Sequence, residues 1–278
     1  MATPKPVTGV FPNTMAYARW GNGAKTLLLI PGGPGNDIPT RQALKMIFRP
    51  FRPLVEDGHN LWMVTRRRRM PQGHTIENMA ADYADLIATE FDGKVDLVVG
   101  VSLGGMIAQY LAANHPDRFD HIAVVSAPPT VSEPSRLEHD WVVARSQGNR
   151  TRAGRLMTAD MLSDSWLRWT APALGTVMGL MFPSQVHDEF ASDIWVEAEA
   201  AWACDARPIL PHIKVPVLLT SGDKELAFPL PLIEETARLI PDCTLKLYEG
   251  KDHSGAIRNP RLAPDILDFV NRKRTAAT

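Results

Sequence analysis

One serine in the chain stands between two glycines at a spacing that suits nucleophilic chemistry. The segment reads Gly100-Val101-Ser102-Leu103-Gly104. When a strand leads into a helix through such a segment, the turn is sharp and strained, and the serine hydroxyl is exposed at the helix N-terminus. Backbone N–H groups at that end of a helix favour developing negative charge. We therefore predict that Ser102 is a nucleophile and that the N–H of Leu103 helps to bind an oxyanion.

The segments on either side have the composition needed to hold this turn. Residues 94–99 are apolar and β-branched, as in a buried strand, and residues 105–113 are typical of a helix. Alternating strands and helices along the chain predict an α/β fold, in which helices cover both faces of a mostly parallel sheet. Further strands are expected at residues 15–20, 25–30, 61–65, 122–125, 215–220 and 244–248, and helices at 41–55 in part, 75–91, 230–239 and 260–272.

The alternation is interrupted between residues 128 and 207, which contain no convincing strand pattern. We expect this segment to be an inserted helical cap over the carboxyl ends of the strands, where open α/β sheets bind ligands. Residues 1–127 and 208–278 then form the core. The insertion holds five of the seven tryptophans, which line a substrate pocket or, alternatively, form only the core of the cap. The candidate pocket residues are Trp141, Trp166, Trp169, Trp202, Met157 and Met178.

Together these features resemble the α/β-hydrolase family, with a helical cap between the sixth and seventh strands. The resemblance rests on a Pro-Gly-Gly-Pro-Gly loop at residues 31–35, the Ser102 turn, an acidic residue after a late strand, and His253. It covers nearly the whole chain outside the cap. The order serine, acid, histidine is the order that this family uses. The resemblance implies a serine hydrolase without a metal or an organic cofactor, in which His253 takes the serine proton.

Two residues are candidates for the acid that orients His253. Glu225 and Asp223 both follow the strand expected at residues 215–220. Counted from the prolines that flank this region, Glu225 stands at the position that the catalytic acid has in relatives. If the count is displaced within this short loop, Asp223 has that position instead. Glutamate can serve in this role. Asp252, next to the histidine, is expected to be a solvated loop residue.

Relatives in this family place a second oxyanion donor in the loop after the early strand. The matching residue is Gly33, with Gly32 adjacent, and it would act together with the N–H of Leu103. Relatives usually begin this loop with histidine, which Pro31 replaces here, although backbone donors do not need it. Residues 66–69 are four arginines at a strand exit. We expect a solvated charged face, or else one arginine that is structural beneath the turn or faces an anionic substrate.

Bulk composition argues against several classes of partner. A formal net charge of -1 and a pI near 6.7 give no sign of nucleic-acid binding. No apolar run is long enough to span a bilayer, and the N-terminus lacks an apolar secretory core. Two cysteines cannot make a disulfide framework. We expect a cytoplasmic protein that takes a small-molecule substrate, with no nucleic-acid or membrane partner and with a homodimer as one candidate assembly.

The function predicted from these residues is hydrolysis of a carboxylic ester or lactone. The tryptophans and methionines of the cap suggest an apolar and bulky substrate, such as an aromatic or polyketide-type lactone. One alternative is a proline-iminopeptidase-like aminopeptidase, prompted by the loop at residues 31–35, with Glu197 and Glu199 as candidates to bind a free amino terminus. Carbon–carbon bond hydrolysis is another. A ligand receptor on a hydrolase scaffold is the non-enzymatic alternative.

Overall fold

The computed structural model describes residues 5–131, 136–161, 169–183, 186–225 and 228–272, and its centre is an eight-stranded sheet. The strands are β1 (Val7–Val10), β2 (Ala16–Trp20), β3 (Lys25–Ile30), β4 (His59–Val64), β5 (Val95–Val101), β6 (Phe119–Val125), β7 (Val217–Gly222) and β8 (Cys243–Tyr248). Their order is β1-β2-β4-β3-β5-β6-β7-β8. β2 pairs antiparallel with β1 and β4, whereas the pairings from β4 to β8 are parallel.

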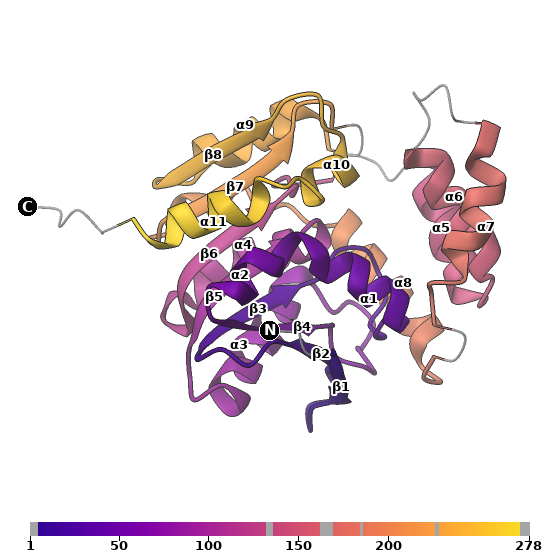
Figure 1. The fold of residues 1–278 in the computed structure, drawn as a ribbon, viewed down its shortest axis with the longest axis horizontal. Helices are drawn as coiled ribbons and strands as arrows, with labels where there is room; N and C mark the ends of the chain where they lie inside the picture. The colour runs from indigo at the N-terminus through magenta and orange to yellow at the C-terminus, as the bar shows by residue number, and fades with distance from the viewer. Residues whose placement is uncertain (1–4, 132–135, 162–168, 184–185, 226–227, 273–278) are drawn as a thin grey trace, which may run out of the picture.

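Helices cover both faces of this sheet (Figure 1). They are α1 (Arg41–Phe48), α2 (Arg52–Glu56), α3 (Ile76–Glu90), α4 (Leu103–Asn114), α9 (Leu230–Leu239), α10 (His253–Ile257) and α11 (Leu262–Val270), with short 3-10 helices η1 (Arg49–Phe51), η2 (Pro116–Arg118) and η4 (Leu210–His212). Side chains of β3 alternate between the two layers: Leu28 and Ile30 pack with α3 and α4, and Leu27 and Leu29 pack with α1 and α11. Burial of each such side chain contributes about 1.5–3 kcal/mol. The predicted α/β fold is confirmed.

Two short elements are present that the sequence pattern does not indicate. β1 is an exposed edge strand that pairs only with β2, so it lacks the alternation of a half-buried strand. α10 begins at His253, and Asp252 is its N-cap, with Oδ1 accepting a hydrogen bond from the Gly255 N–H at 2.6 Å. Asp252 is therefore a half-buried loop residue, as expected in part, and its capping bond also holds the backbone at His253.

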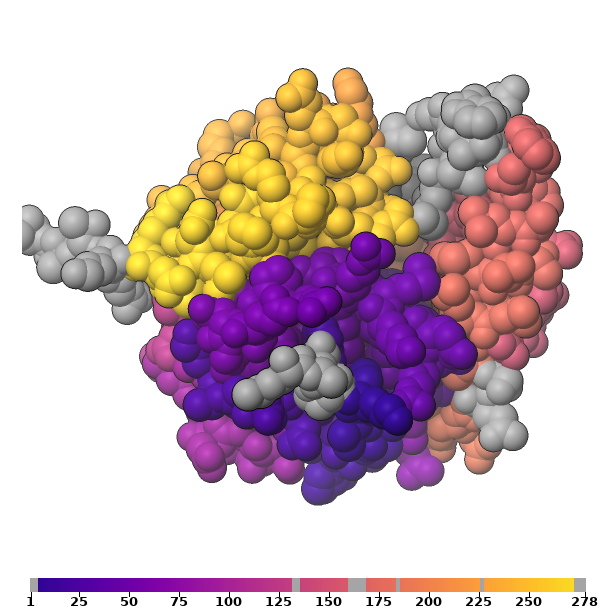
Figure 2. Space-filling model, in the orientation of Figure 1, coloured from indigo at the N-terminus to yellow at the C-terminus, as the bar shows by residue number. Residues whose placement is uncertain are grey.

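Helices α5 to α8 lie between β6 and β7 in the chain, and we call them the cap helices. They are α5 (Arg136–Ser146), α6 (Arg150–Met161), α7 (Ala171–Gly179) and α8 (Phe190–Trp202). Figures 1 and 2 show them at one end of the molecule, with α8 closest to the core. Val142 of α5 packs with Phe190, Ile194 and Ala198 of α8 in a small apolar cluster. Every helix in the described part of the chain is too short or too polar to cross a membrane.

Candidate active site

Ser102 lies at the turn between β5 and α4, at the carboxyl edge of the sheet. Its backbone has φ 53° and ψ −121°, a strained conformation for a residue with a side chain. Its N–H donates to the Val125 carbonyl of β6 at 2.8 Å, which holds the turn against the neighbouring strand. A Cβ at Gly104 would collide with the Ile30 carbonyl of β3, so α4 can begin this close to the sheet only with glycine there.

A hydrogen bond joins His253 to Glu225. His253 Nδ1 lies 2.8 Å from Glu225 Oε2, and the Glu225 side chain is fully buried while that of His253 is 26% exposed. Glu225 follows β7 and His253 follows β8, so two adjacent parallel strands bring them to one edge. The other candidate, Asp223, has an Oδ1 that is buried without a hydrogen-bond partner among the described residues. The structure therefore brings Glu225, and not Asp223, to the imidazole.

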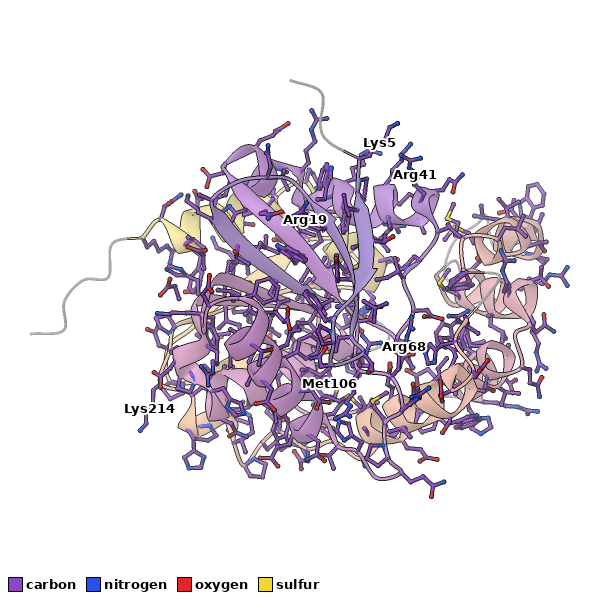
Figure 3. The ribbon with its side chains drawn as sticks, turned by 90° about the horizontal axis from the view of Figure 1, so that it is seen from below. Lys5, Arg19, Arg41, Arg68, Met106 and Lys214 are labelled. Carbon is purple, nitrogen blue, oxygen red and sulfur yellow. The ribbon has the colours of Figure 1, made fainter. Side chains whose placement is uncertain are left out.

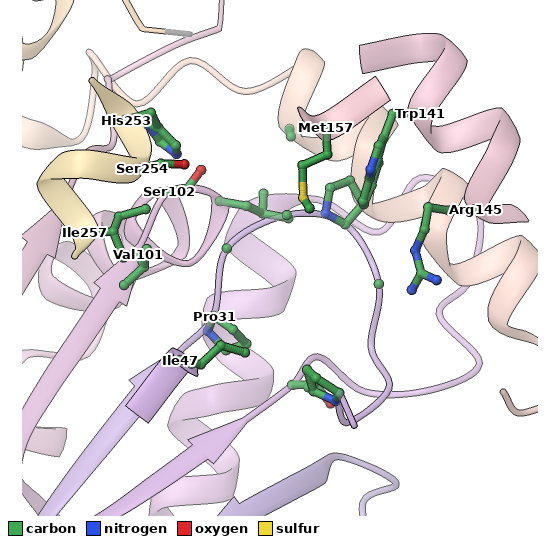
Figure 4. Close-up of a pocket in the computed structure, with 18 of the residues that line it drawn as sticks. Pro31, Ile47, Val101, Ser102, Trp141, Arg145, Met157, His253, Ser254 and Ile257 are labelled. Carbon is green, nitrogen blue, oxygen red and sulfur yellow. The ribbon is translucent and has the colours of Figure 1, made fainter. Parts of the chain in front are cut away.

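Ser102 and His253 line the same cavity, which has a volume of about 590 Å³. In Figure 4 the Ser102 hydroxyl points toward the His253 ring. The expected oxyanion-hole residues Gly32, Gly33 and Leu103 also line this cavity. Gly32 passes so close to the serine that an added Cβ would lie 2.8 Å from Ser102 Cβ. The predicted nucleophile, base and oxyanion donors thus meet at one place, and their catalytic roles stay predictions.

Arg66 is buried beneath the loop that carries Gly33, and only 1% of it is exposed. Its Nη1 donates to the Pro31 carbonyl at 2.8 Å, and its Nη2 donates to the carbonyls of Gly33 at 2.6 Å and Gly35 at 2.9 Å. Nη2 also pairs with Glu197 Oε2 at 2.6 Å. Burial disfavours the charged guanidinium, but this pairing leaves the pKa of Arg66 raised. Arg66 is therefore not part of a solvated face. It is structural, as in the alternative expectation, but it holds the loop at residues 31–35.

Two buried carboxylates fasten the cap helix α8 to the core loops. Glu197 Oε2 accepts a hydrogen bond from the Gly35 N–H at 2.7 Å. Asp193 accepts from the Asn36 side-chain amide at 2.8 Å, and from the backbone N–H groups of residues 69 and 70 at 3.0 and 2.8 Å. Burial raises the pKa of Glu197, and the Arg66 guanidinium opposes that rise. The two acids are one helical turn apart, so one face of α8 docks on both loops.

The other three arginines of the run pair with carboxylates nearer the surface. The expectation of a solvated charged face therefore fits these three better than it fits Arg66. Figure 3 shows Arg68 on the side of the core that faces the cap helices. Arg69 bonds to Glu189 at the start of α8, and this is the second ion pair between the arginine run and the cap helices. The pairs are Arg67 with Asp82 at 3.3 Å, Arg68 with Asp37 at 3.0 Å and Arg69 with Glu189 at 2.6 Å.

The cavity wall is mainly apolar and contains half of the large cap residues that were predicted to line it. Trp141, Trp202 and Met157 are part of the wall. Trp169 is not, because its side chain is 74% exposed to solvent. Met178 is also absent from the wall, since it lies on α7, which packs mainly against α6. Trp166 lies outside the described residues.

Sequence reasoning missed several residues of the wall. Phe182, Phe228 and Ile257 supply apolar surface, and Arg145 brings a buried cation from α5. Phe228 also packs edge-on against the His253 ring at 5.3 Å between ring centres. No pattern in the sequence marks these positions, because each reaches the cavity from a separate short element. Within the described part of the chain, no cluster of His, Cys, Asp and Glu side chains suits a metal ion.

The two glutamates considered for binding an amino terminus do not belong to the cavity wall. Glu197 is fully buried and is already bonded to Arg66 and to the Gly35 N–H. Glu199 is on the exposed side of α8. Neither carboxylate is therefore available to an ammonium group that enters the cavity.

Known proteins similar to this chain include hydrolases, esterases and haloperoxidases. It is 26% identical to a putative carbamate hydrolase RutD from Yersinia enterocolitica over 88% of this chain and 86% of that protein. It is 27% identical to a non-heme chloroperoxidase from Streptomyces lividans over 82% and 85% of the two chains. It is 29% identical to a pimeloyl-[acyl-carrier protein] methyl ester esterase from Neisseria meningitidis over 67% and 60%.

Solved structures share the fold. An enol-lactonase from Burkholderia xenovorans superposes with a TM-score of 0.68, at 22% identity, over 92% of this chain and 96% of that chain. An esterase from Exiguobacterium antarcticum superposes with a TM-score of 0.69, at 17% identity, over 94% and 99%. Residues 27–264 match the family model described as the alpha/beta hydrolase family. The chain therefore belongs to the alpha/beta hydrolase family.

Proposed function

We propose that the protein hydrolyses carboxylic esters or lactones, with Ser102 as nucleophile, His253 as base and Glu225 as the acid that orients His253. The observation that carries this proposal is the 2.8 Å hydrogen bond from His253 to buried Glu225 beside a cavity that Ser102 also lines. A carboxylate on Nδ1 fixes the imidazole tautomer that leaves Nε2 free to accept a proton. The strained turn at Ser102 puts this residue at the cavity that His253 also lines, where its hydroxyl would give up its proton to Nε2.

The reaction proceeds through an acyl-enzyme. Ser102 Oγ attacks the carbonyl carbon while its proton passes to His253 Nε2, and a tetrahedral oxyanion forms. The carbon–oxygen bond to the alcohol then breaks, and the alcohol leaves with the proton from His253. Water next attacks the acyl-enzyme, again giving a proton to the imidazole, and the serine oxygen recovers that proton as the acid departs. Glu225 stabilises the imidazolium at each stage and is not itself protonated.

The oxyanion is stabilised by backbone donors. The N–H of Leu103 belongs to the first turn of α4, where helical N–H groups have no acceptor within the helix. The second donor is the N–H of Gly33, with Gly32 held against the serine beside it. Arg66 supports this arrangement, since its guanidinium binds three carbonyls of the same loop and so turns the peptide groups in a fixed direction. Donors that are already oriented cost no reorganisation during the reaction.

The cavity wall supports an apolar substrate of moderate size. A volume of about 590 Å³ is in the range of small-molecule sites, and Trp141, Trp202 and Met157 provide apolar surface. The names of the relatives, which include a methyl ester esterase and an enol-lactonase, agree with cleavage of an ester bond. The aminopeptidase alternative has less support, because Glu197 is occupied by Arg66.

A panel of aryl esters and aryl lactones, assayed together with an aminoacyl naphthylamide, tests this proposal. Wild-type protein should turn over the esters many times, and a serine-directed phosphonate should label Ser102 and abolish turnover. Ser102→Ala should lose both labelling and activity. Labelling at another residue would contradict the proposal, as would hydrolysis of the naphthylamide alone. A single burst without turnover would instead favour the receptor alternative, and cleavage of a diketone alone would favour carbon–carbon bond hydrolysis.

A further inference from the structure

Arg145 lines the cavity from the cap helix α5, and it is only 7% exposed. Its guanidinium carbon lies 4.3 Å from the ring centre of Phe182, 4.9 Å from that of Phe190 and 5.8 Å from that of Trp141. Three aromatic rings therefore surround the cation and hold it in place by cation–π attraction. Aromatic rings do not supply the oxygen acceptors that a guanidinium fork can bind.

This arginine has no carboxylate partner within the described part of the chain. No described carboxylate oxygen lies within 4.0 Å of its guanidinium nitrogens, and its Nε is buried without an acceptor. Asp37 also lines the cavity, but it is bonded to Arg68 at 3.0 Å and accepts the His187 N–H at 3.3 Å. Arg66, the other deeply buried arginine of the site, has both a carboxylate and three carbonyls as partners.

We propose that Arg145 binds a carboxylate of the substrate at a position remote from the bond that is cleaved. A buried cation without a partner is unfavourable, and an incoming carboxylate would remove that penalty. The planar guanidinium fork matches the two oxygens of a carboxylate. Burial lowers the pKa of Arg145 to about 10, so the side chain is still a cation at neutral pH.

The position of Arg145 indicates which part of the substrate carries the charge. Figure 4 shows Arg145 across the cavity from Ser102 and His253, with Trp141 and Met157 along the wall. A substrate with its carbonyl at Ser102 and its carboxylate at Arg145 would therefore have an apolar middle. Glu138 and the exposed Arg258 are further charged residues of the wall. This inference rests on the proposed ester hydrolysis and narrows the substrate class to esters or lactones with a free carboxylate.

Matched pairs of aryl esters test the inference. The first member of each pair is the 4-nitrophenyl half-ester of glutaric, adipic or suberic acid, and in the second a methyl group replaces the free carboxylate. Wild-type kcat/KM should favour the best half-ester by roughly tenfold or more, because a charge-assisted hydrogen bond to a buried partner discriminates by about this factor. Arg145→Met, which keeps the length and apolar packing of the side chain, should lower kcat/KM for half-esters roughly 10- to 100-fold, mainly through KM.

Controls separate a binding role from a structural one. Arg145→Met should lower kcat/KM for the neutral esters far less than for the half-esters, and Arg145→Lys should recover part of the half-ester activity because it restores the charge without the fork. Arg152→Met, at a cap arginine that is 48% exposed, is the matched control and should change neither series. Equal losses for neutral and charged esters in Arg145→Met would overturn the inference, as would the absence of a carboxylate preference in the wild type.

A binding measurement distinguishes failure of this inference from failure of the proposed function. Titration calorimetry of Ser102→Ala with adipate or suberate should show binding that is lost in the double variant Ser102→Ala/Arg145→Met. If no ester is hydrolysed but this binding is found, the carboxylate site stands and ester hydrolysis fails. If neutral esters are hydrolysed and no dicarboxylate binds, ester hydrolysis stands and the carboxylate site fails. The preference of the wild type for half-esters and the binding of a dicarboxylate to Ser102→Ala are both measured with Arg145 present, so the absence of both would overturn the inference even if Arg145→Met does not fold.

Discussion

Arg66 Nη2 lies 2.6 Å from Glu197 Oε2, and both side chains are almost completely buried. Arg66 comes from the exit of β4 and holds the loop at residues 31–35, whereas Glu197 comes from the cap helix α8. One ion pair therefore connects the candidate oxyanion loop to the cap. A shift of α8 would move the acceptor of the Gly35 N–H and change the charge beneath this loop.

Removal of Glu197 should destabilise the protein strongly. Glu197→Leu leaves the Arg66 guanidinium buried with carbonyl partners only, and loss of one partner of a buried pair typically costs about 3–5 kcal/mol. We expect a loss of that size in the free energy of unfolding, measured by urea denaturation, together with slower ester turnover. Arg66→Met/Glu197→Leu should lose less than the sum of the two single variants, because neither charge is left alone.

Glu189→Leu is the matched control for this prediction. Glu189, at the start of α8, also pairs with an arginine of the run, but this partner, Arg69, is 73% exposed. Water screens an exposed pair and weakens its contribution, so the loss of stability in Glu189→Leu should be small. Equal effects of Glu189→Leu and Glu197→Leu would show that the buried pair has no special role.

The two candidate acids should differ sharply in their effect on turnover. Glu225→Gln keeps the shape of the side chain but removes the charge that stabilises the imidazolium, so kcat should fall roughly 10³- to 10⁴-fold. Asp223→Asn should have a far smaller effect, since the hydrogen bond to His253 Nδ1 comes from Glu225. Steady-state assays on one aryl ester measure both. A larger loss in Asp223→Asn would contradict the assignment.

Ser102 and the sheet could be predicted from local patterns in the sequence, whereas His253 was implied by the resemblance to α/β hydrolases. A buried strand before Ser102 and a helix after it are short-range signals, and both elements are present. The choice between Glu225 and Asp223 could not be made in the same way, because two residues in one short loop differ only in the direction of their side chains. That direction depends on how the loop after β7 meets α10, which is a tertiary contact.

Long-range pairing accounts for what the sequence did not reveal. In the sequence Arg66 is one of four consecutive arginines, and its partner Glu197 lies on a cap helix far along the chain. Trp169 and Trp202 are both tryptophans of the inserted segment, so the sequence does not distinguish them. Trp169 is nevertheless 74% exposed, whereas Trp202 lines the cavity. Short cap helices lack enough turns for periodicity to show which face meets the core. For the same reason, nothing local identified Arg145 as a residue of the cavity.

Truncation of Trp202 should impair hydrolysis of bulky esters, whereas truncation of Trp169 should not. Trp202→Ala removes apolar surface from the cavity wall, and loss of about 1.5 kcal/mol of substrate contact lowers kcat/KM roughly tenfold. A small ester such as an aryl acetate should be less affected because it does not extend that far. Trp169→Ala is the natural control for loss of an indole ring. Equal changes in the two variants would contradict the placement of Trp202 at the substrate.

His59 should make stability depend on pH between neutrality and mild acid. Its side chain is 1% exposed and Nδ1 donates to the Leu54 carbonyl at 3.0 Å, while Nε2 is buried without a partner among the described residues. Burial lowers the pKa of His59, and the bond to Leu54 only partly opposes this. The unfolded chain therefore binds the proton more tightly, so the stability from neutral His59 is complete above the unfolded pKa of about 6.5 and is lost as pH falls toward the folded pKa.

A variant at this position isolates the effect. His59→Asn keeps an N–H donor near the Leu54 carbonyl but cannot take up a proton in this range. Its free energy of unfolding, measured by urea denaturation between about pH 7.5 and pH 5, should fall less steeply with acid than that of the wild type. His212→Asn, at an exposed histidine, controls for the loss of one imidazole. Parallel pH profiles for His59→Asn and the wild type would mean that His59 is not protonated on unfolding in this range.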